Sequence, residues 1–351
     1  MHRKKEFVWL YPVCALVFSL YVLTHPIACS FYTKKALDIC FTTLIPSLFP
    51  FVFASSFFAC VMPENVRENF ILNFFAKLFG VSHTLTPGVI LGLFSGFPTG
   101  AVFVTKMYER GFCSKNQAVR AICLSNNCSA SFLIGIAGTT VLGSAKYGVM
   151  LLACQITAVI ITSQILKITS RNENEKNFSV PNANKALTTN FSKALTESIK
   201  SSSMSMLFVS GFVVFFYTLS SILNDTFFPT SNIFKVISGT VLEISTGTLA
   251  CQNLSFPLSM VFCAFCICFP SLSVLFQIKS ITDEHFDITR KYILSRLCIS
   301  LISAICACII VYSNIIVFLL LCGVYFSFST VFLPLGQAIR QNRVKNAQKK
   351  L

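Results

Sequence analysis

Residues 88–101, GVILGLFSGFPTGA, decide how this chain folds. The stretch is apolar enough for a membrane, but Pro98 interrupts it. Its glycines recur at every fourth position, at Gly88, Gly92, Gly96 and Gly100. A spanning helix needs about 20 apolar residues, and proline removes a helical hydrogen bond. We therefore predict a re-entrant hairpin that lines a site, with the polar Ser95 and Thr99 at its tip.

The composition of the chain is that of a membrane protein. Its 351 residues are 54% hydrophobic and only 12% charged, which excludes a large soluble domain and predicts an all-α polytopic membrane protein. The formal charge of +15 is explained by loops, because Lys and Arg concentrate on the cytoplasmic side of membrane proteins. We expect the lipid bilayer as a partner and no nucleic acid.

Sequence motifs give no sign of an enzyme. The chain has no nucleophile elbow, P-loop or metalloprotease motif. Most of its 16 cysteines lie in apolar runs, where Cys behaves as a small hydrophobic residue, and no Cys/His cluster has zinc spacing. We expect no catalytic residue, no metal and no cofactor, apart from H⁺ or Na⁺ as a coupling ion.

The apolar runs predict about eight transmembrane helices and two re-entrant hairpins. The first helix follows MHRKKEF without a clear cleavage motif, which indicates an uncleaved signal anchor. Residues 63–84 are expected to form an interfacial amphipathic helix. The predicted hairpins are 88–101 and 236–250, and the predicted spans are 7–29, 36–62, 121–143, 147–166, 201–223, 256–278, 292–313 and 315–335.

Basic residues predict the sidedness of the chain. If both termini are cytoplasmic and both hairpins return to the side they left, 24 of the 28 Lys and Arg residues lie on the cytoplasmic side. A hairpin that crossed the membrane would invert the following loops and abolish this bias. The cytoplasmic segments are then the N-terminus, 63–84, 105–121, 167–200, 279–296 and the C-terminal tail.

An internal repeat relates the two halves of the chain. Four matches occur in the same order, and the predicted topology makes the two copies inverted repeats, the architecture of secondary transporters. In the first match, SLFPFVFASSFF resembles SMLFVSGFVVFF, and in the second, Gly88, Leu91 and Gly96 correspond to Gly239, Leu242 and Gly247. In the third, Ser129 and Ser131 correspond to Ser271 and Ser273, and in the fourth, Tyr147 corresponds to Tyr292. The expected division is a signal anchor (1–35), a first repeat (36–167), a cytoplasmic linker (168–200), a second, inverted repeat (201–313), and a last helix with a basic tail (314–351).

Glu243 is the only acidic residue in either hairpin. A carboxylate inside a membrane is costly unless it is paired, hydrated or protonated, so it indicates a functional site. It would bind a polar group of the substrate or take up a coupling proton; the alternative is a structural hydrogen bond to the hairpin's own backbone. Its repeat partner is Gly92, and Ser245 and Thr246 lie beside it, where helix N-termini present N–H groups to an anionic ligand.

Asn126 and Asn127 lie in the middle of a predicted span, followed by Ser129. Two roles stay open for these amides: coordination of substrate or Na⁺, or satisfaction of carbonyls freed by a helix break. Their counterparts in the second repeat are Ser271, Ser273 and Gln277. For the glycines we expect close packing at Gly88 and Gly92 and turns at Gly96 and Gly100.

Four stretches together resemble a known family. GLFSGFPTGA, MYERGFCSKNQA, LSNNCSASFLIGIAG and VLEISTG resemble the YlbJ (SpoVV) type of sporulation integral membrane protein, with nucleoside-recognition (Gate) domains related to concentrative nucleoside transporters. The resemblance covers roughly residues 36–312. It implies movement of dipicolinic acid across the outer forespore membrane, with the hairpin tips and the Asn-containing span at the substrate-binding centre.

We therefore expect a secondary transporter for a small polar or anionic solute, foremost dipicolinate, working by alternating access. One alternative is a nucleoside or nucleobase transporter coupled to Na⁺ or H⁺. The other is a non-transporting membrane scaffold in spore formation, which would use the linker and the tail. Homo-oligomers or other sporulation membrane proteins are the expected protein partners.

Overall fold

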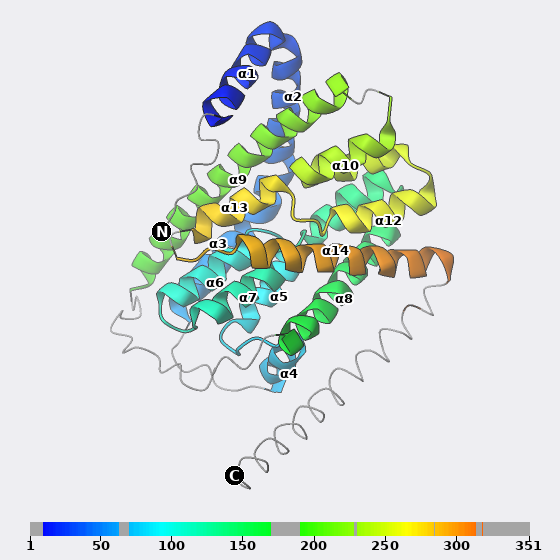
Figure 1. The fold of residues 1–351 in the computed structure, drawn as a ribbon. Helices are drawn as coiled ribbons and strands as arrows, with labels where there is room; N and C mark the ends of the chain where they lie inside the picture. The colour runs from blue at the N-terminus through cyan, green and yellow to red at the C-terminus, as the bar shows by residue number, and fades with distance from the viewer. Residues whose placement is uncertain are drawn as a thin grey trace, which may run out of the picture.

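The computed structural model describes residues 10–62, 70–169, 190–227, 230–283, 285–313 and 318. Within these ranges the chain is helical and contains no strand. The predicted fold class, an all-α polytopic membrane protein, is confirmed (Figure 1). The first half comprises α1 (Leu10–Thr24), α2 (Pro26–Ile39), the π-helix η1 (Cys40–Leu44), α3 (Ile45–Val61), α4 (Phe70–Phe79), α5 (Thr86–Ser95), α6 (Thr99–Glu109), α7 (Lys115–Ser125), the π-helix η2 (Phe132–Val141) and α8 (Ala145–Thr169).

The second half repeats this order of elements. It comprises α9 (Phe191–Phe227), α10 (Asn232–Leu242), α11 (Ile244–Ala250), the short 3₁₀-helix η4 (Cys251–Asn253), α12 (Phe256–Cys266), α13 (Leu272–Thr282) and α14 (Thr289–Tyr312).

Four helices of the described part are long and apolar enough to cross a membrane. They are the continuous helix Pro26–Val61, Ala145–Lys167 in α8, α9 and α14. Each exceeds the roughly 20 residues that a bilayer requires. The predicted span 315–335 lies outside the described residues except for Phe318, so the count of eight spans stays a prediction.

The boundary predicted between the first two spans is wrong. No loop separates 7–29 from 36–62: α1 ends at Thr24, and one helix of 36 residues runs from Pro26 to Val61. Pro26 takes the first helical position, where a missing N–H costs nothing. The π-turn η1 precedes Pro46, so the wider turn accommodates the proline within a continuous helix.

The predicted fifth span, 201–223, lies inside a longer helix. The helix α9 begins at Phe191 and joins the expected surface segment to the span in 37 residues. The serines in this region remain helical because Ser202 and Ser205 donate hydrogen bonds to the carbonyls of Ser198 and Ser201, one turn earlier.

Two of the predicted spans are broken in the middle. The span 121–143 divides into α7 and η2, and the span 256–278 divides into α12 and α13. The non-helical linkers are 126–129 and 267–271. We call the place where they meet the junction.

Both predicted hairpins form as pairs of short contacting helices, α5 with α6 and α10 with α11. In the first, Ser95 ends α5, Thr99 begins α6, and Gly96 makes the turn with a φ of 89°. In the second, Glu243 alone separates the two helices, with extended backbone. The turn predicted at Gly100 is wrong, because this glycine lies inside α6 and packs against Ser125.

The hairpins correct the register of the internal repeat. Aligning the last residues of α5 and α10, Ser95 and Leu242, places Gly92 with Gly239, four residues away from the predicted register. Glu243 then corresponds to the turn residue Gly96 rather than to Gly92. The acid therefore lies at the tip itself, where the chain passes from one short helix to the next.

Corresponding helices of the two halves contact one another reciprocally. The helix α3 packs against α9, and α8 packs against α14. The helix α7 contacts α14 while α12 contacts α8, and α6 contacts α13 while α11 contacts η2. Figure 1 shows α14 running between α12 and the α7–α8 side of the molecule. A two-fold related repeat with its centre at the junction would produce this pattern.

Candidate substrate site at the junction

The two helix breaks touch each other. The thiol of Cys128 in the first break donates a hydrogen bond of 3.1 Å to the carbonyl of Ile267 in the second. Gln155 of α8 fixes the first break, because its amide accepts from the N–H of Cys128 at 3.1 Å and donates to the Cys128 carbonyl at 3.0 Å. The backbone N–H and C=O of Cys128 are thereby satisfied, as the interior of a membrane protein requires.

The tip of the first hairpin rests on the first break. The N–H of Phe97 donates to the carbonyl of Asn127 at 2.8 Å. A Cβ atom at Gly96 would lie 2.8 Å from the backbone N of Ser129. A Cβ atom at Gly92 would lie 1.8 Å from the carbonyl oxygen of Ser125. The glycines thus let the hairpin backbone approach the end of α7 and the break directly, which confirms the packing role predicted for Gly92.

Asn126 and Asn127 are almost fully buried. Their amide nitrogens donate to the carbonyls of Ile122 at 2.6 Å and Leu124 at 2.8 Å. The structural role, satisfying carbonyls at the end of a helix, is therefore present. The side-chain oxygens remain for other partners: that of Asn127 accepts from Arg296, and that of Asn126 has no partner in the described part.

Arg296 is the residue that sequence analysis placed wrongly. It was counted in a cytoplasmic loop, but it lies in α14 with an exposed fraction of 2%. Its Nη1 donates to Asn127 Oδ1 at 2.8 Å, its Nε has no hydrogen-bond partner, and it forms no ion pair among the described residues. A guanidinium stays protonated in proteins, so Arg296 is a buried positive charge, and the described residues give it no carboxylate partner.

Several of the buried polar atoms without a partner in the described part lie on the elements around Arg296. They come from the hairpin tip, the end of α7, the first break and α14 itself. In the described part they include Thr99 Oγ1, Ser125 Oγ, Asn126 Oδ1, Tyr292 Oη and Arg296 Nε. Buried polar groups normally have hydrogen-bond partners. A binding site for a polar ligand would contain such unpartnered atoms before the ligand binds.

Glu243 is 3% exposed and caps α11. Its carboxylate accepts from the N–H of Thr246 at 3.0 Å and from the hydroxyl of Ser245 at 3.3 Å. The alternative role, a hydrogen bond to the hairpin's own backbone, is therefore present.

The predicted serines have matching local roles. Ser129 accepts from the N–H of Phe132, and Ser271 accepts from the N–H of Val274, so each caps the second half of its own broken span. Ser273 accepts a hydrogen bond of 3.0 Å from Gln277 within α13. The hydrogen bonds described for Ser273 and Gln277 do not join them to the junction.

Replacing Glu243 separates its capping role from any role of its charge. Glu243→Gln retains an acceptor for the Thr246 N–H, so we expect an unchanged midpoint of thermal unfolding in detergent. Glu243→Ala removes the cap and should lower the free energy of unfolding by about 1 kcal/mol. Equal midpoints for the alanine variant and the wild type would show that the cap does not stabilise the hairpin.

Arg296, Gln155 and Cys128 are the residues of this site that sequence analysis missed. A signal existed for Arg296, since it lies four residues inside the predicted span 292–313. A charge at that depth calls for a functional explanation. No comparable signal identified Gln155 or Cys128, whose partners lie 27 and 139 residues away in sequence.

Comparison with known proteins gives one distant relative. The chain is 22% identical over 315 residues to the sporulation integral membrane protein YlbJ of Bacillus subtilis (strain 168). The match covers 79% of this chain and 76% of the relative. No protein-family model matches the chain, and no solved structure is similar to it. The relationship supports an integral membrane protein of sporulation, while the link to nucleoside transporters stays a prediction.

Proposed function

We propose that this protein is a secondary transporter for a small organic anion, with dipicolinate as the foremost substrate. The observation that carries the proposal is Arg296, buried at the junction without a counter-ion among the described residues. An uncompensated buried charge costs several kcal/mol. An arriving carboxylate would remove this cost, so binding and charge compensation would be the same event.

The chemistry of Arg296 favours a carboxylate as the bound group. The guanidinium carries five N–H donors in a planar fork that matches a carboxylate. One of its terminal nitrogens bonds Asn127, and Nε is unoccupied. Dipicolinate has two carboxylates on a flat aromatic ring, so one carboxylate would engage Arg296 and leave the second for hydroxyl and amide donors near the hairpin tip.

The hairpin provides a movable element beside this group. Its tip is bonded to the backbone of Asn127, and Arg296 is bonded to the side chain of the same residue. Binding at Arg296 would therefore alter the contact that holds the hairpin against the break. Alternating access would follow from movement of the hairpins around the junction, as in other transporters with broken helices.

The sporulation setting rests on the distant relative and on the sequence resemblance. A mother-cell protein in the outer forespore membrane, with both termini in the cytoplasm, would move the anion out of the mother cell. Glu243 is the candidate for a proton-coupling residue, because it is the one Asp or Glu that is buried among the described residues.

The proposal is tested by uptake into proteoliposomes. Purified protein should accumulate labelled dipicolinate above the level of empty liposomes, and unlabelled uridine should not compete. Competition by uridine would favour the nucleoside alternative. Absence of dipicolinate uptake by folded protein would remove dipicolinate as the substrate. If Glu243 couples protons, Glu243→Gln should transport without a response to an imposed pH gradient.

A further inference from the structure

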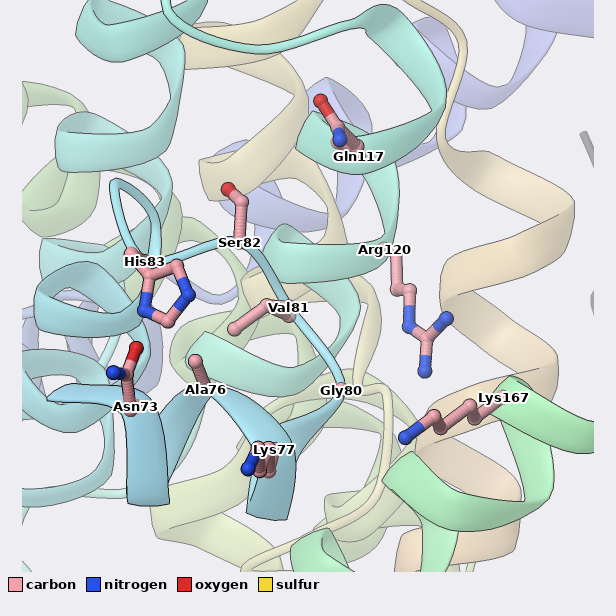
Figure 2. Close-up of a pocket in the computed structure, with 10 residues that line it drawn as sticks. All are labelled: Asn73, Ala76, Lys77, Gly80, Val81, Ser82, His83, Gln117, Arg120 and Lys167. Carbon is pink, nitrogen blue, oxygen red and sulfur yellow. The ribbon is translucent and has the colours of Figure 1, made fainter. Parts of the chain in front are cut away.

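A second polar site lies away from the junction, between α4, α7 and α8. It is a pocket of about 490 Å³. Figure 2 shows its lining side chains, which come from α4, the following loop, the first half of α7 and the end of α8. The lining residues are Asn73, Ala76, Lys77, Gly80, Val81, Ser82, His83, Gln117, Arg120 and Lys167. Among these described residues there are three basic side chains and a histidine, and no Asp or Glu.

The backbone brings two of the cations together. Gly80 has a φ of 58°, and a Cβ atom there would lie 2.6 Å from Arg120 Nη2 and 3.3 Å from Lys167 Cδ. Both side chains therefore pack over the same glycine, and Figure 2 shows their charged ends pointing toward one another. Basic side chains gathered at one pocket attract an anion.

Rigid contacts hold this pocket in shape. Arg120 donates to the carbonyl of Ser163 at 3.2 Å, and the hydroxyl of Ser163 donates to the carbonyl of Leu78 at 3.0 Å. These bonds fasten the end of α4 to α8 and aim Arg120 at the pocket. The Nδ1 atom of His83 is buried there without a hydrogen-bond partner in the described part.

The helix α4 also carries an apolar surface next to the cations. Phe70, Phe74 and Lys77 follow the spacing that places side chains on one helix face, and Phe70 is 83% exposed. Ile71 beside them is 59% exposed. In an interfacial helix such a surface is covered by acyl chains. The basic pocket thus lies where a lipid headgroup would be, with hydrocarbon alongside.

We propose that this pocket binds the phosphate of an anionic phospholipid headgroup, with Lys77, Arg120 and Lys167 compensating its charge. Basic pockets between helices at the cytoplasmic face bind such headgroups. The segments that provide the three cations are all predicted to be cytoplasmic. Bound lipid would fasten α4 to α7 and α8, and α7 leads directly to the first break. The proposal is independent of the transport function.

The test compares lipids and variants by thermal unfolding of the purified full-length chain. Phosphatidylglycerol should raise the unfolding midpoint above the value in phosphatidylcholine, and high salt should reduce the difference. Lys77→Gln combined with Lys167→Gln should lose the shift, whereas Lys115→Gln, which removes one exposed charge from α7 outside the pocket, should retain it. Each single pocket variant should lose part of the shift, which keeps the test valid if the double variant does not fold.

Two results would overturn the proposal. An equal shift by phosphatidylglycerol in the wild type and in the pocket variants would place the lipid elsewhere. An equal shift by inorganic phosphate, in the absence of anionic lipid, would assign the pocket to a soluble phosphate instead of a membrane component.

Discussion

Arg296→Gln is expected to reduce dipicolinate uptake into proteoliposomes to the level of empty liposomes without lowering the midpoint of thermal unfolding. The substitution removes a buried charge that has no counter-ion among the described residues, so the folded state is relieved of a desolvation cost. Transport is lost because the site no longer attracts a carboxylate.

Arg296→Lys is the matched control for charge. It keeps the cation but not the planar fork. We expect the loss of one charge-assisted hydrogen bond, which contributes about 1.5–3 kcal/mol. The apparent affinity for dipicolinate should therefore weaken by about tenfold to a hundredfold. Uptake by Arg296→Gln at the wild-type rate would refute the anion site. Failure of Arg296→Gln to fold would show that Arg296 supports the structure through its bond to Asn127.

Gly92→Ala is expected to have the largest effect on stability. The added Cβ atom would lie 1.8 Å from the carbonyl oxygen of Ser125, which belongs to the end of α7 and moves only with the backbone. The hairpin and the first broken span must separate, at a cost of about 3 kcal/mol. We expect a clearly lower unfolding midpoint and a loss of transport.

Gly211→Ala is the control for this substitution. Gly211 lies within α9, and a Cβ atom there meets nothing within 4 Å. Alanine is favoured over glycine inside a helix by about 0.5–1 kcal/mol, so the midpoint should stay level or rise. A similar loss of stability in both variants would show that backbone flexibility, rather than the approach to Ser125, is what Gly92 provides.

The hairpins were predictable because their cause is local. A short apolar stretch with regular glycines and a proline cannot span a bilayer, and the structure forms the expected tip at Gly96 with Ser95 and Thr99 beside it. The same glycine pattern left the register of the repeat undetermined. Because the first hairpin has a glycine at every fourth position, Gly239 and Gly247 match it equally well after a shift of four residues. The ends of α5 and α10 favour the shifted register.

The helix breaks and the charge at the junction depend on tertiary structure. Hydrophobic length alone does not distinguish a continuous span from two half-spans, although Asn126 and Asn127 in one break and Pro270 in the other were local signals. The bond between Arg296 and Asn127 joins residues 169 positions apart. Such a contact follows from the packing of α14 against α7, which no local pattern encodes.

Ligand binding by the purified protein tests the anion site most directly. Thermal unfolding is followed as dipicolinate is added to the wild type and to Arg296→Gln. The wild type should be stabilised increasingly, by about 2.7 kcal/mol at a concentration one hundred times the dissociation constant, while the variant should show no change. Equal stabilisation of both proteins would contradict the assignment of Arg296 as the group that binds the transported anion.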